Sequence, residues 1–170
     1  RRGSNQLLLS VNPFFIALAL LLALGLNLLP LGRYPARPDI LALVLVFWNV
    51  HQPRRVGVGV AFFFGLLMDV HEGALLGQHA LAYTVLGFGA IAIHRRLLWF
   101  PVPQQALQVL PLFVVAALLQ LAVRLAAGGT FPGLDTLLAP VIESLLWPLV
   151  TVLLLAPQRR APDPDEDRPL

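Results

Sequence analysis

Residues 56–93 read VGVGVAFFFGLLMDVHEGALLGQHALAYTVLGFGAIAI, two apolar runs joined by a short polar turn. The first run covers residues 56–70 and the second covers residues 73–93, and neither contains Lys or Arg. In a bilayer the backbone must bond within its own segment, so apolar runs of this kind form helices. The stretch therefore predicts a membrane-embedded helical hairpin.

Small residues recur along both runs at helical spacing. In the first run Gly57, Ala61 and Gly65 lie four residues apart, followed by Asp69, and in the second run they are Gly73, Gly77, Ala80, Thr84 and Gly87. Small side chains let helix backbones approach closely, so we expect these two ridges to pack the hairpin together. Asp69 either bonds local backbone amides near the Gly-rich turn or serves a binding role, and both interpretations stay open.

The composition of the whole chain supports a membrane protein. Of 170 residues, 58% are hydrophobic and 12% are charged, and the mean hydropathy is +0.78. Soluble domains are about one quarter charged, so this chain has too little charge to cover a surface facing water. The absence of Cys excludes disulfides, thiolate metal sites and lipid-modified cysteines.

The other apolar runs complete a pattern of six transmembrane helices. Asn12-Pro13 is a helix-start signal, and the run that follows is long for a signal peptide and lacks a small-residue cleavage site before Arg33, which favours a retained helix. The second and third runs are short, so they either lie within protein or thin the bilayer. The predicted helices are residues 13–32, 39–50, 56–70, 73–93, 107–127 and 137–155. Residues 1–155 thus form the transmembrane domain, and 156–170 are expected to be a disordered cytoplasmic tail.

Arginine positions predict the orientation of the helices. All twelve basic residues are Arg, and they lie in scattered pairs, which argues against nucleic-acid binding. With six spans and a cytoplasmic N-terminus, nine Arg lie inside and two, Arg33 and Arg37, lie outside. This positive-inside bias predicts that both termini are cytoplasmic.

Arg124 and Glu143 are charged residues within predicted spans. Their depths differ by only about 5 Å at helical rise, so we expect an ion pair that joins the last two helices. A proton or ion relay is the alternative interpretation. A relay needs titratable groups across the membrane, whereas the groups here all fall in the outer half, so proton-coupled transport is disfavoured.

The sequence offers little for catalysis, metals or cofactors. His71-Glu72 lacks a second His at the spacing of a helical metal site, and a phosphate-binding loop with Lys is impossible because the chain has no Lys. No Ser lies in a nucleophile-elbow pattern. We therefore expect a protein that is not an enzyme and holds no cofactor. Trp147-Pro148 in the last span predicts a kink where a partner helix or ligand can enter.

Several short motifs follow one another along the chain: residues 37–39 (RPD), Trp48, residues 53–59 (PRRVGVG), residues 65–69 (GLLMD), Gly73, Leu76-Gly77 and residues 146–148 (LWP). In their order and spacing, these motifs resemble the MreD family of bacterial rod shape-determining membrane proteins. This resemblance implies an integral protein of the bacterial inner membrane that belongs to the cell-elongation machinery for peptidoglycan synthesis. The implied partners are MreC, the RodA glycosyltransferase, its penicillin-binding transpeptidase and the actin-like MreB. The resemblance also implies a fold similar to the substrate-binding subunits of energy-coupling-factor transporters.

The partner-binding candidates come from this resemblance and from the small-residue ridges. They are Arg37, Pro38, Asp39, Pro53, Arg55, Gly57, Gly65, Asp69, Gly73, Gly77, Trp147 and Pro148. The function we expect is a non-enzymatic scaffold whose ridges and Pro-kinked faces accept the membrane anchor of MreC, while cytoplasmic Arg pairs offer charge to MreB or to anionic lipid. A small-molecule-binding subunit of a membrane transporter is the alternative.

Overall fold

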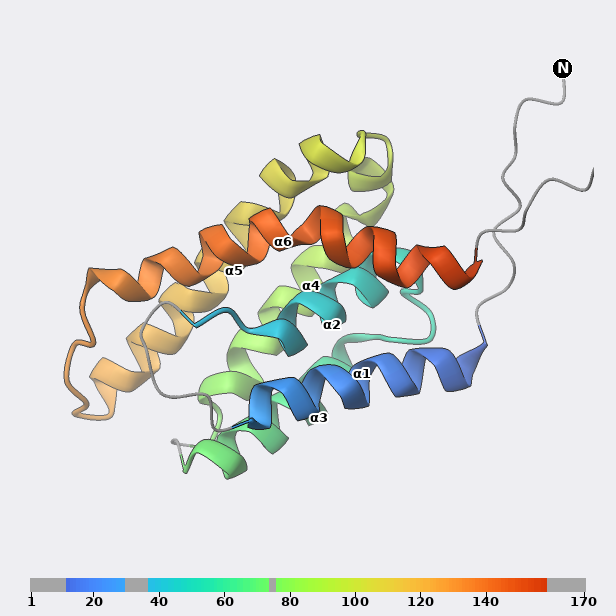
Figure 1. Ribbon diagram of the computed structural model, residues 1–170. Helices are drawn as coiled ribbons and strands as arrows, with labels where there is room; N and C mark the ends of the chain where they lie inside the picture. The colour runs from blue at the N-terminus through green and yellow to red at the C-terminus, as the bar shows by residue number, and fades with distance from the viewer. Residues whose placement is uncertain (1–11, 30–36, 74–75, 159–170) are drawn as a thin grey trace, which may run out of the picture.

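The computed structural model describes residues 12–29, 37–73 and 76–158. Within these ranges the chain is all-helical, with six α-helices, two short 3-10 helices and no strand (Figure 1). The α-helices are α1 (Pro13–Leu28), α2 (Ile40–His51), α3 (Val58–Glu72), α4 (Gln78–Leu98), α5 (Val102–Ala126) and α6 (Leu138–Leu155). The 3-10 helices are η1 (Leu134–Leu137), directly before α6, and η2 (Ala156–Gln158), directly after it.

Two helix starts differ from the predicted positions for local reasons. Helix α4 begins at Gln78 and not at residue 73, because Gly73 (φ 61°) and Gly77 (φ 111°) both adopt a left-handed conformation that interrupts a right-handed helix. Helix α5 begins at Val102, five residues before the predicted start at 107, with a proline in its first turn. Of the predicted disordered tail, residues 156–158 form η2 and the remainder lies outside the described residues, as do residues 1–11 and 30–32.

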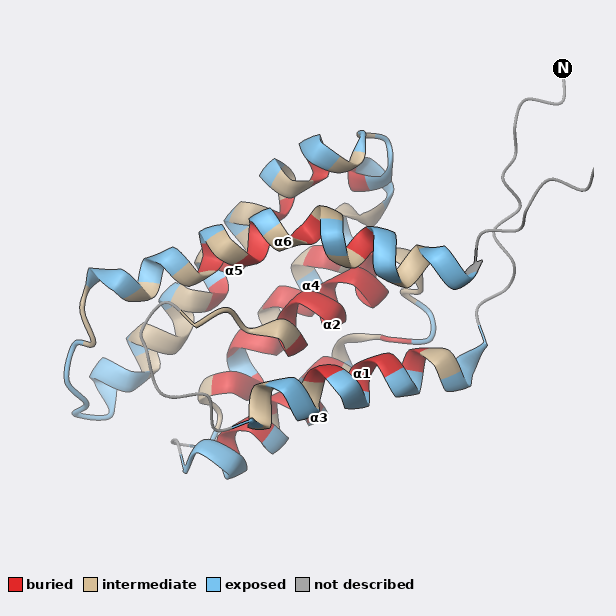
Figure 2. Ribbon diagram, in the orientation of Figure 1, coloured by how far each residue is buried: buried red, intermediate tan, exposed pale blue. Residues whose placement is uncertain are grey.

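Helix α2 lies at the centre of the bundle. It packs against α1, α4 and α6, and all ten residues from Leu41 to Val50 are buried, as its colour in Figure 2 shows. Twelve helical residues extend about 18 Å, which is less than the hydrocarbon thickness of about 30 Å. Because its neighbours enclose it, this short helix lies in protein surroundings, which was one of the two predicted outcomes.

Among the residues that the structure describes, three helical segments are long and apolar enough to cross a membrane. They are Gln78–Leu98, Val102–Ala126 and Leu134–Leu155, of 21, 25 and 22 residues. Large apolar side chains point outward from them, such as Phe88 (68% exposed) and Leu145 (72% exposed). Such surfaces suit contact with lipid. Six complete spans and cytoplasmic termini stay predictions.

Helices α3 and α4 form the predicted hairpin, and they share the most extensive contact between two helices in the described chain. A methyl group built on Gly65 would lie 2.5 Å from the Cα of Ala80, so α3 approaches the α4 backbone here closely enough to require glycine. Further along, Ala61 faces Gly87. The predicted packing of small residues is thus confirmed for Gly65 with Ala80 and for Ala61 with Gly87. Gly73 and Gly77, predicted on the same face of the fourth helix, instead lie in the turn before α4.

Candidate functional site

Most of the buried charge lies at one end of the bundle, where α1, α3 and α5 finish and α2, α4 and α6 begin. We call this the polar end. At the polar end, Arg37 links the connection before α2 to the end of α1. The Nη2 of Arg37 donates to the carbonyls of Leu26 (3.1 Å), Asn27 (3.0 Å) and Leu29 (3.0 Å). Carbonyls at a helix C-terminus lack partners within the helix and favour a cation. Arg37 thus closes the end of α1.

Asp39, two residues later, joins four helices. It caps α2, because its Oδ1 accepts a hydrogen bond from the backbone N–H of Ala42 (2.9 Å). The same oxygen accepts one from Asn27 Nδ2 of α1 (2.6 Å), and Oδ2 accepts one from the hydroxyl of Tyr83 of α4. The Asp39 N–H donates to Glu143 Oε1 of α6 (3.1 Å). Pro38, between Arg37 and Asp39, belongs to the short non-helical connection directly before α2.

Asp69, fully buried near the end of α3, caps the start of α4. Its carboxylate accepts hydrogen bonds from the backbone N–H groups of Gly77 (2.9 Å), His79 (2.7 Å) and Ala80 (3.2 Å). His79 Nδ1 lies 3.0 Å from the same carboxylate, and its Nε2 lies 3.5 Å from Glu72. Of the two interpretations of Asp69, bonding to nearby backbone amides is confirmed. The amides belong to the first turn of α4, which would otherwise lack partners.

Trp147 is a buried anchor between α6 and α5. Its Nε1 donates to Gln105 Oε1 (3.1 Å), and Gln105 Nε2 donates to the carbonyl of Phe100 (3.0 Å). Trp147 has no exposed surface, so it packs inside the chain and cannot contact a partner directly. Pro148 lies within α6, which continues through it as one helix.

Pro53, Arg55 and Gly57 lie at the opposite end of the bundle, in the connection from α2 to α3. The N–H groups of Arg55 and Val56 donate to the carbonyl of Gln52 at 3.1 and 2.9 Å, and Gly57 is the extended residue before α3. The structure therefore does not bring all the predicted site residues together. Those from residues 37–39, 65–77 and 143 belong to the polar end, and those from residues 53–57 do not.

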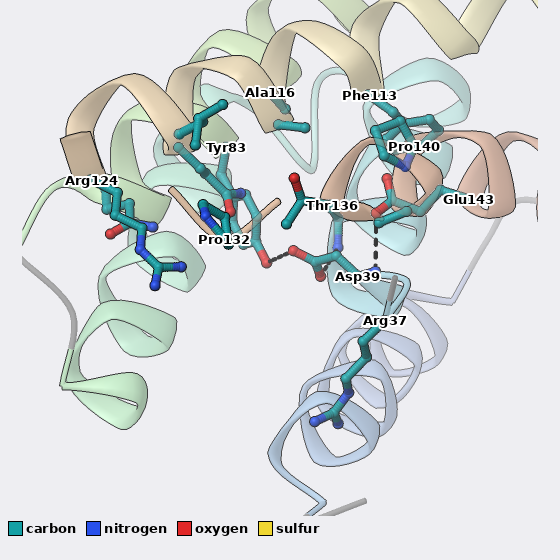
Figure 3. A pocket seen from close by; sticks show the side chains of 16 residues that line it. Arg37, Asp39, Tyr83, Phe113, Ala116, Arg124, Pro132, Thr136, Pro140 and Glu143 are labelled. Carbon is teal, nitrogen blue, oxygen red and sulfur yellow. Dashed lines mark hydrogen bonds between the residues drawn. The ribbon is translucent and has the colours of Figure 1, made fainter. Parts of the chain in front are cut away.

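A pocket of about 180 Å³ opens beside Asp39 at the polar end (Figure 3). Polar side chains from four helices line it: Asp39 of α2, Gln78 and Tyr83 of α4, Gln120 and Arg124 of α5, and Glu143 of α6. Apolar side chains of α5 and α6, including Phe113 and Pro140, form the rest of its wall.

The predicted ion pair between Arg124 and Glu143 is wrong. Both residues line the pocket, but Figure 3 shows them on opposite sides of it. Glu143 is 6% exposed and bonds to the Asp39 N–H, whereas Arg124 is exposed, and the ion pairs of the described residues all involve His79. Similar positions along two helices do not fix the lateral separation of two side chains across a cavity.

Three residues that join the helices were not predicted as site residues: Asn27, Tyr83 and Gln105. Each is a side chain with a hydrogen-bonding group within or beside an apolar run, and a buried group of this kind requires a partner. A hydrogen-bonding side chain in such a position could have been recognised in the sequence as one that needs a partner, but the sequence does not show which partner it finds. In the described part of the chain, no three His, Cys, Asp or Glu side chains cluster as metal ligands.

These features define a class: an all-helical membrane protein whose buried polar side chains tie helix ends together and leave a pocket at one end. The sequence matches the family described as rod shape-determining protein MreD over residues 5–156, so the chain belongs to the MreD family. It is 31% identical over 135 residues to the rod shape-determining protein MreD of Haemophilus influenzae, a match that covers 77% of this chain and 81% of that relative. No solved structure gives a significant match. The predicted family is thus confirmed, and the role of the chain lies in determining cell shape.

Proposed function

We propose that this chain is a non-enzymatic scaffold in the cell-elongation complex of the bacterial inner membrane, where it binds MreC. The observation that carries this proposal is the use of its buried polar groups. The carboxylate oxygens of Asp39 and Asp69 accept hydrogen bonds from backbone amides at helix starts and from side chains of neighbouring helices. Such bonds hold helices in fixed positions, which is what a docking platform requires.

The pocket is our candidate for the contact with MreC. The small-residue ridges are occupied within the chain, since Gly65 packs on Ala80 and Ala61 on Gly87, so they are not free for a partner helix. The pocket instead offers space lined by polar groups from four helices. We propose that the MreC anchor crosses the membrane beside the bundle and that the residues adjoining this anchor enter the pocket.

The opposite end of the bundle suits cytoplasmic partners. Arg54, Arg55, Arg95 and Arg96 are all exposed there, two after α2 and two in the last turn of α4. In the proposed topology they face the cytoplasm, where arginine pairs attract anionic lipid or an acidic surface of MreB. RodA and its penicillin-binding transpeptidase belong to the same proposed assembly.

Site-directed crosslinking tests the proposed MreC contact, and it is simple because the chain has no Cys. Gln120→Cys and Thr136→Cys place a thiol at the pocket, and Phe88→Cys and Leu145→Cys place one on outward faces of α4 and α6. We expect crosslinks from a thiol-reactive, photoactivatable reagent to MreC at the two pocket positions. Crosslinks confined to the outward positions, or none at any position on a chain that co-purifies with MreC, would show that the contact lies elsewhere.

The pocket also supports a second candidate, a small-molecule-binding subunit of a membrane transporter. A cavity between helices with a few converging polar groups is the usual form of a ligand site. A binding screen of vitamins and lipid-linked wall precursors separates the two candidates. A specific, saturable ligand whose affinity falls in Glu143→Ala but not in Glu72→Ala would favour this second function over the scaffold.

A further inference from the structure

Glu143 is a buried carboxylate in the pocket that can accept more hydrogen bonds than it does. Its Oε1 accepts one hydrogen bond, from the Asp39 N–H at 3.1 Å, and its Oε2 has no hydrogen-bond partner among the described residues. The side chain is nevertheless 6% exposed. Burial of a carboxylate costs free energy unless a cation or several donors face it.

Asp39, the other carboxylate in the pocket, is already satisfied. Its two oxygens accept hydrogen bonds from the Ala42 N–H, the Asn27 amide and the Tyr83 hydroxyl. Asp39 therefore has little capacity left for a ligand. Of the two carboxylates in the pocket, the buried one, Glu143, is therefore the one with free acceptor capacity.

No Arg side chain among the described residues forms an ion pair with Glu143. The Arg37 guanidinium donates to three carbonyls at the end of α1 and points away from the pocket in Figure 3. Arg124 lies on the opposite side of the pocket from Glu143, and it forms no ion pair among the described residues. Oε2 is therefore open to a donor supplied by an occupant of the cavity.

The shape of the pocket restricts that occupant. A volume of about 180 Å³ is close to that of a protein cavity that holds one benzene molecule, about 150 Å³, so it has space for one long side chain. Phe113, Ala116, Ala139 and Pro140 supply apolar wall, and Glu143 supplies the acceptor. An apolar wall beside a carboxylate matches a side chain that has a methylene stem and a cationic head.

We infer that the pocket takes a lysine or arginine side chain of its partner, with the methylene stem against α5 and α6 and the cationic head on Glu143 Oε2. This inference rests on the proposed function for the identity of the partner, MreC. The chemistry of recognition rests on the pocket alone. Glu143 is then the residue that makes the pocket selective for a basic side chain.

Glu143→Gln tests this inference with little structural change, because the amide oxygen can still accept from the Asp39 N–H. We expect MreC to bind this variant about 30-fold or more weakly, the loss typical when one member of a buried charge pair is removed. Glu72→Gln is the matched control, since Glu72 is half-exposed and is not among the residues that line the pocket. Each Lys and Arg next to the MreC anchor is then changed to Gln, alone and together with Glu143→Gln. One of them should show strong non-additivity with Glu143.

A second measurement does not depend on MreC. n-Butylammonium carries the head and stem of a lysine side chain, and n-butanol is its neutral counterpart. We expect n-butylammonium, but not n-butanol, to raise the melting temperature of the full chain in detergent, and to do so in Glu72→Gln but not in Glu143→Gln. Equal MreC binding by wild type and Glu143→Gln, or an equal response of both to the amine, would overturn the inference. Failure of the wild type to bind MreC would instead refute the proposed function, and the amine experiment would still decide the chemistry of the pocket.

Discussion

Gly65→Ala adds one methyl group where α3 packs tightly on α4. The new Cβ would lie 2.5 Å from the Ala80 Cα, 2.7 Å from the Ala80 N and 2.7 Å from the His79 carbonyl oxygen. All three neighbours are backbone atoms, so no side chain can rotate away. The two helices must separate for the methyl group to fit.

The size of this separation follows from ordinary contact distances. To bring the 2.5 Å approach to the 3.4 Å at which normal contact begins, α3 and α4 must move apart by about 0.9 Å. Overpacking of this kind costs about 1–3 kcal/mol. The same movement lengthens the hydrogen bonds from Asp69 to the first turn of α4, so we expect the upper part of that range.

Thermal unfolding of the detergent-purified chain measures this cost, followed by circular dichroism or by the loss of the monodisperse species. We expect Gly65→Ala to lower the melting temperature by roughly 4–12 °C. Gly59→Ala is the matched control on the same helix, because its methyl group meets nothing within 4 Å and replaces glycine by a better helix former. If Gly65→Ala has the same melting temperature as the wild type and Gly59→Ala, the close approach of α3 and α4 does not stabilise the hairpin.

Three further substitutions test the links at the polar end and between α5 and α6 by the same unfolding measurement. Asp69→Ala leaves three amides of the first turn of α4 without an acceptor, and we expect a loss of about 3 kcal/mol, whereas a loss below about 1 kcal/mol would contradict the capping role. Tyr83→Phe removes one donor to Asp39 and should cost about 1–2 kcal/mol. Trp147→Phe leaves the Gln105 carbonyl oxygen unpaired and should cost about 1–3 kcal/mol. Gln105→Leu in the same background should recover part of that loss, because both partners are then apolar.

The number of helices was predictable because apolar runs and Pro or Gly breakers are local features. The start of α4 was not, because small-residue spacing continues unbroken through Gly73 and Gly77 and gives no sign that both residues have positive φ. The short run that forms α2 also left two possibilities open. Only the packing of α1, α4 and α6 around it shows that protein, not a thinned bilayer, surrounds it.

The sequence identified several residues of the candidate site, but it did not identify the contacts between them. Residues 37–39 and Asp69 stood out as charge beside apolar runs, and the structure uses Arg37, Asp39 and Asp69 to close helix ends. The pairing of Arg124 with Glu143 failed because sequence gives depth along each helix but not the position of one helix around another. Glu143 instead faces the start of α2, which is 104 residues away along the chain.

Local features of the sequence are enough to assign the environment, the helices and the family of this protein. The chain is apolar and carries little charge, which indicates a lipid environment. Each apolar run ends at local helix breakers, and the order of the motifs is that of the MreD family. Which polar groups meet depends instead on how the helices pack. Hydrogen bonds act over about 3 Å, and the positions of their partners depend on how all six helices pack, so the pocket and the open oxygen of Glu143 emerge only from the assembled bundle.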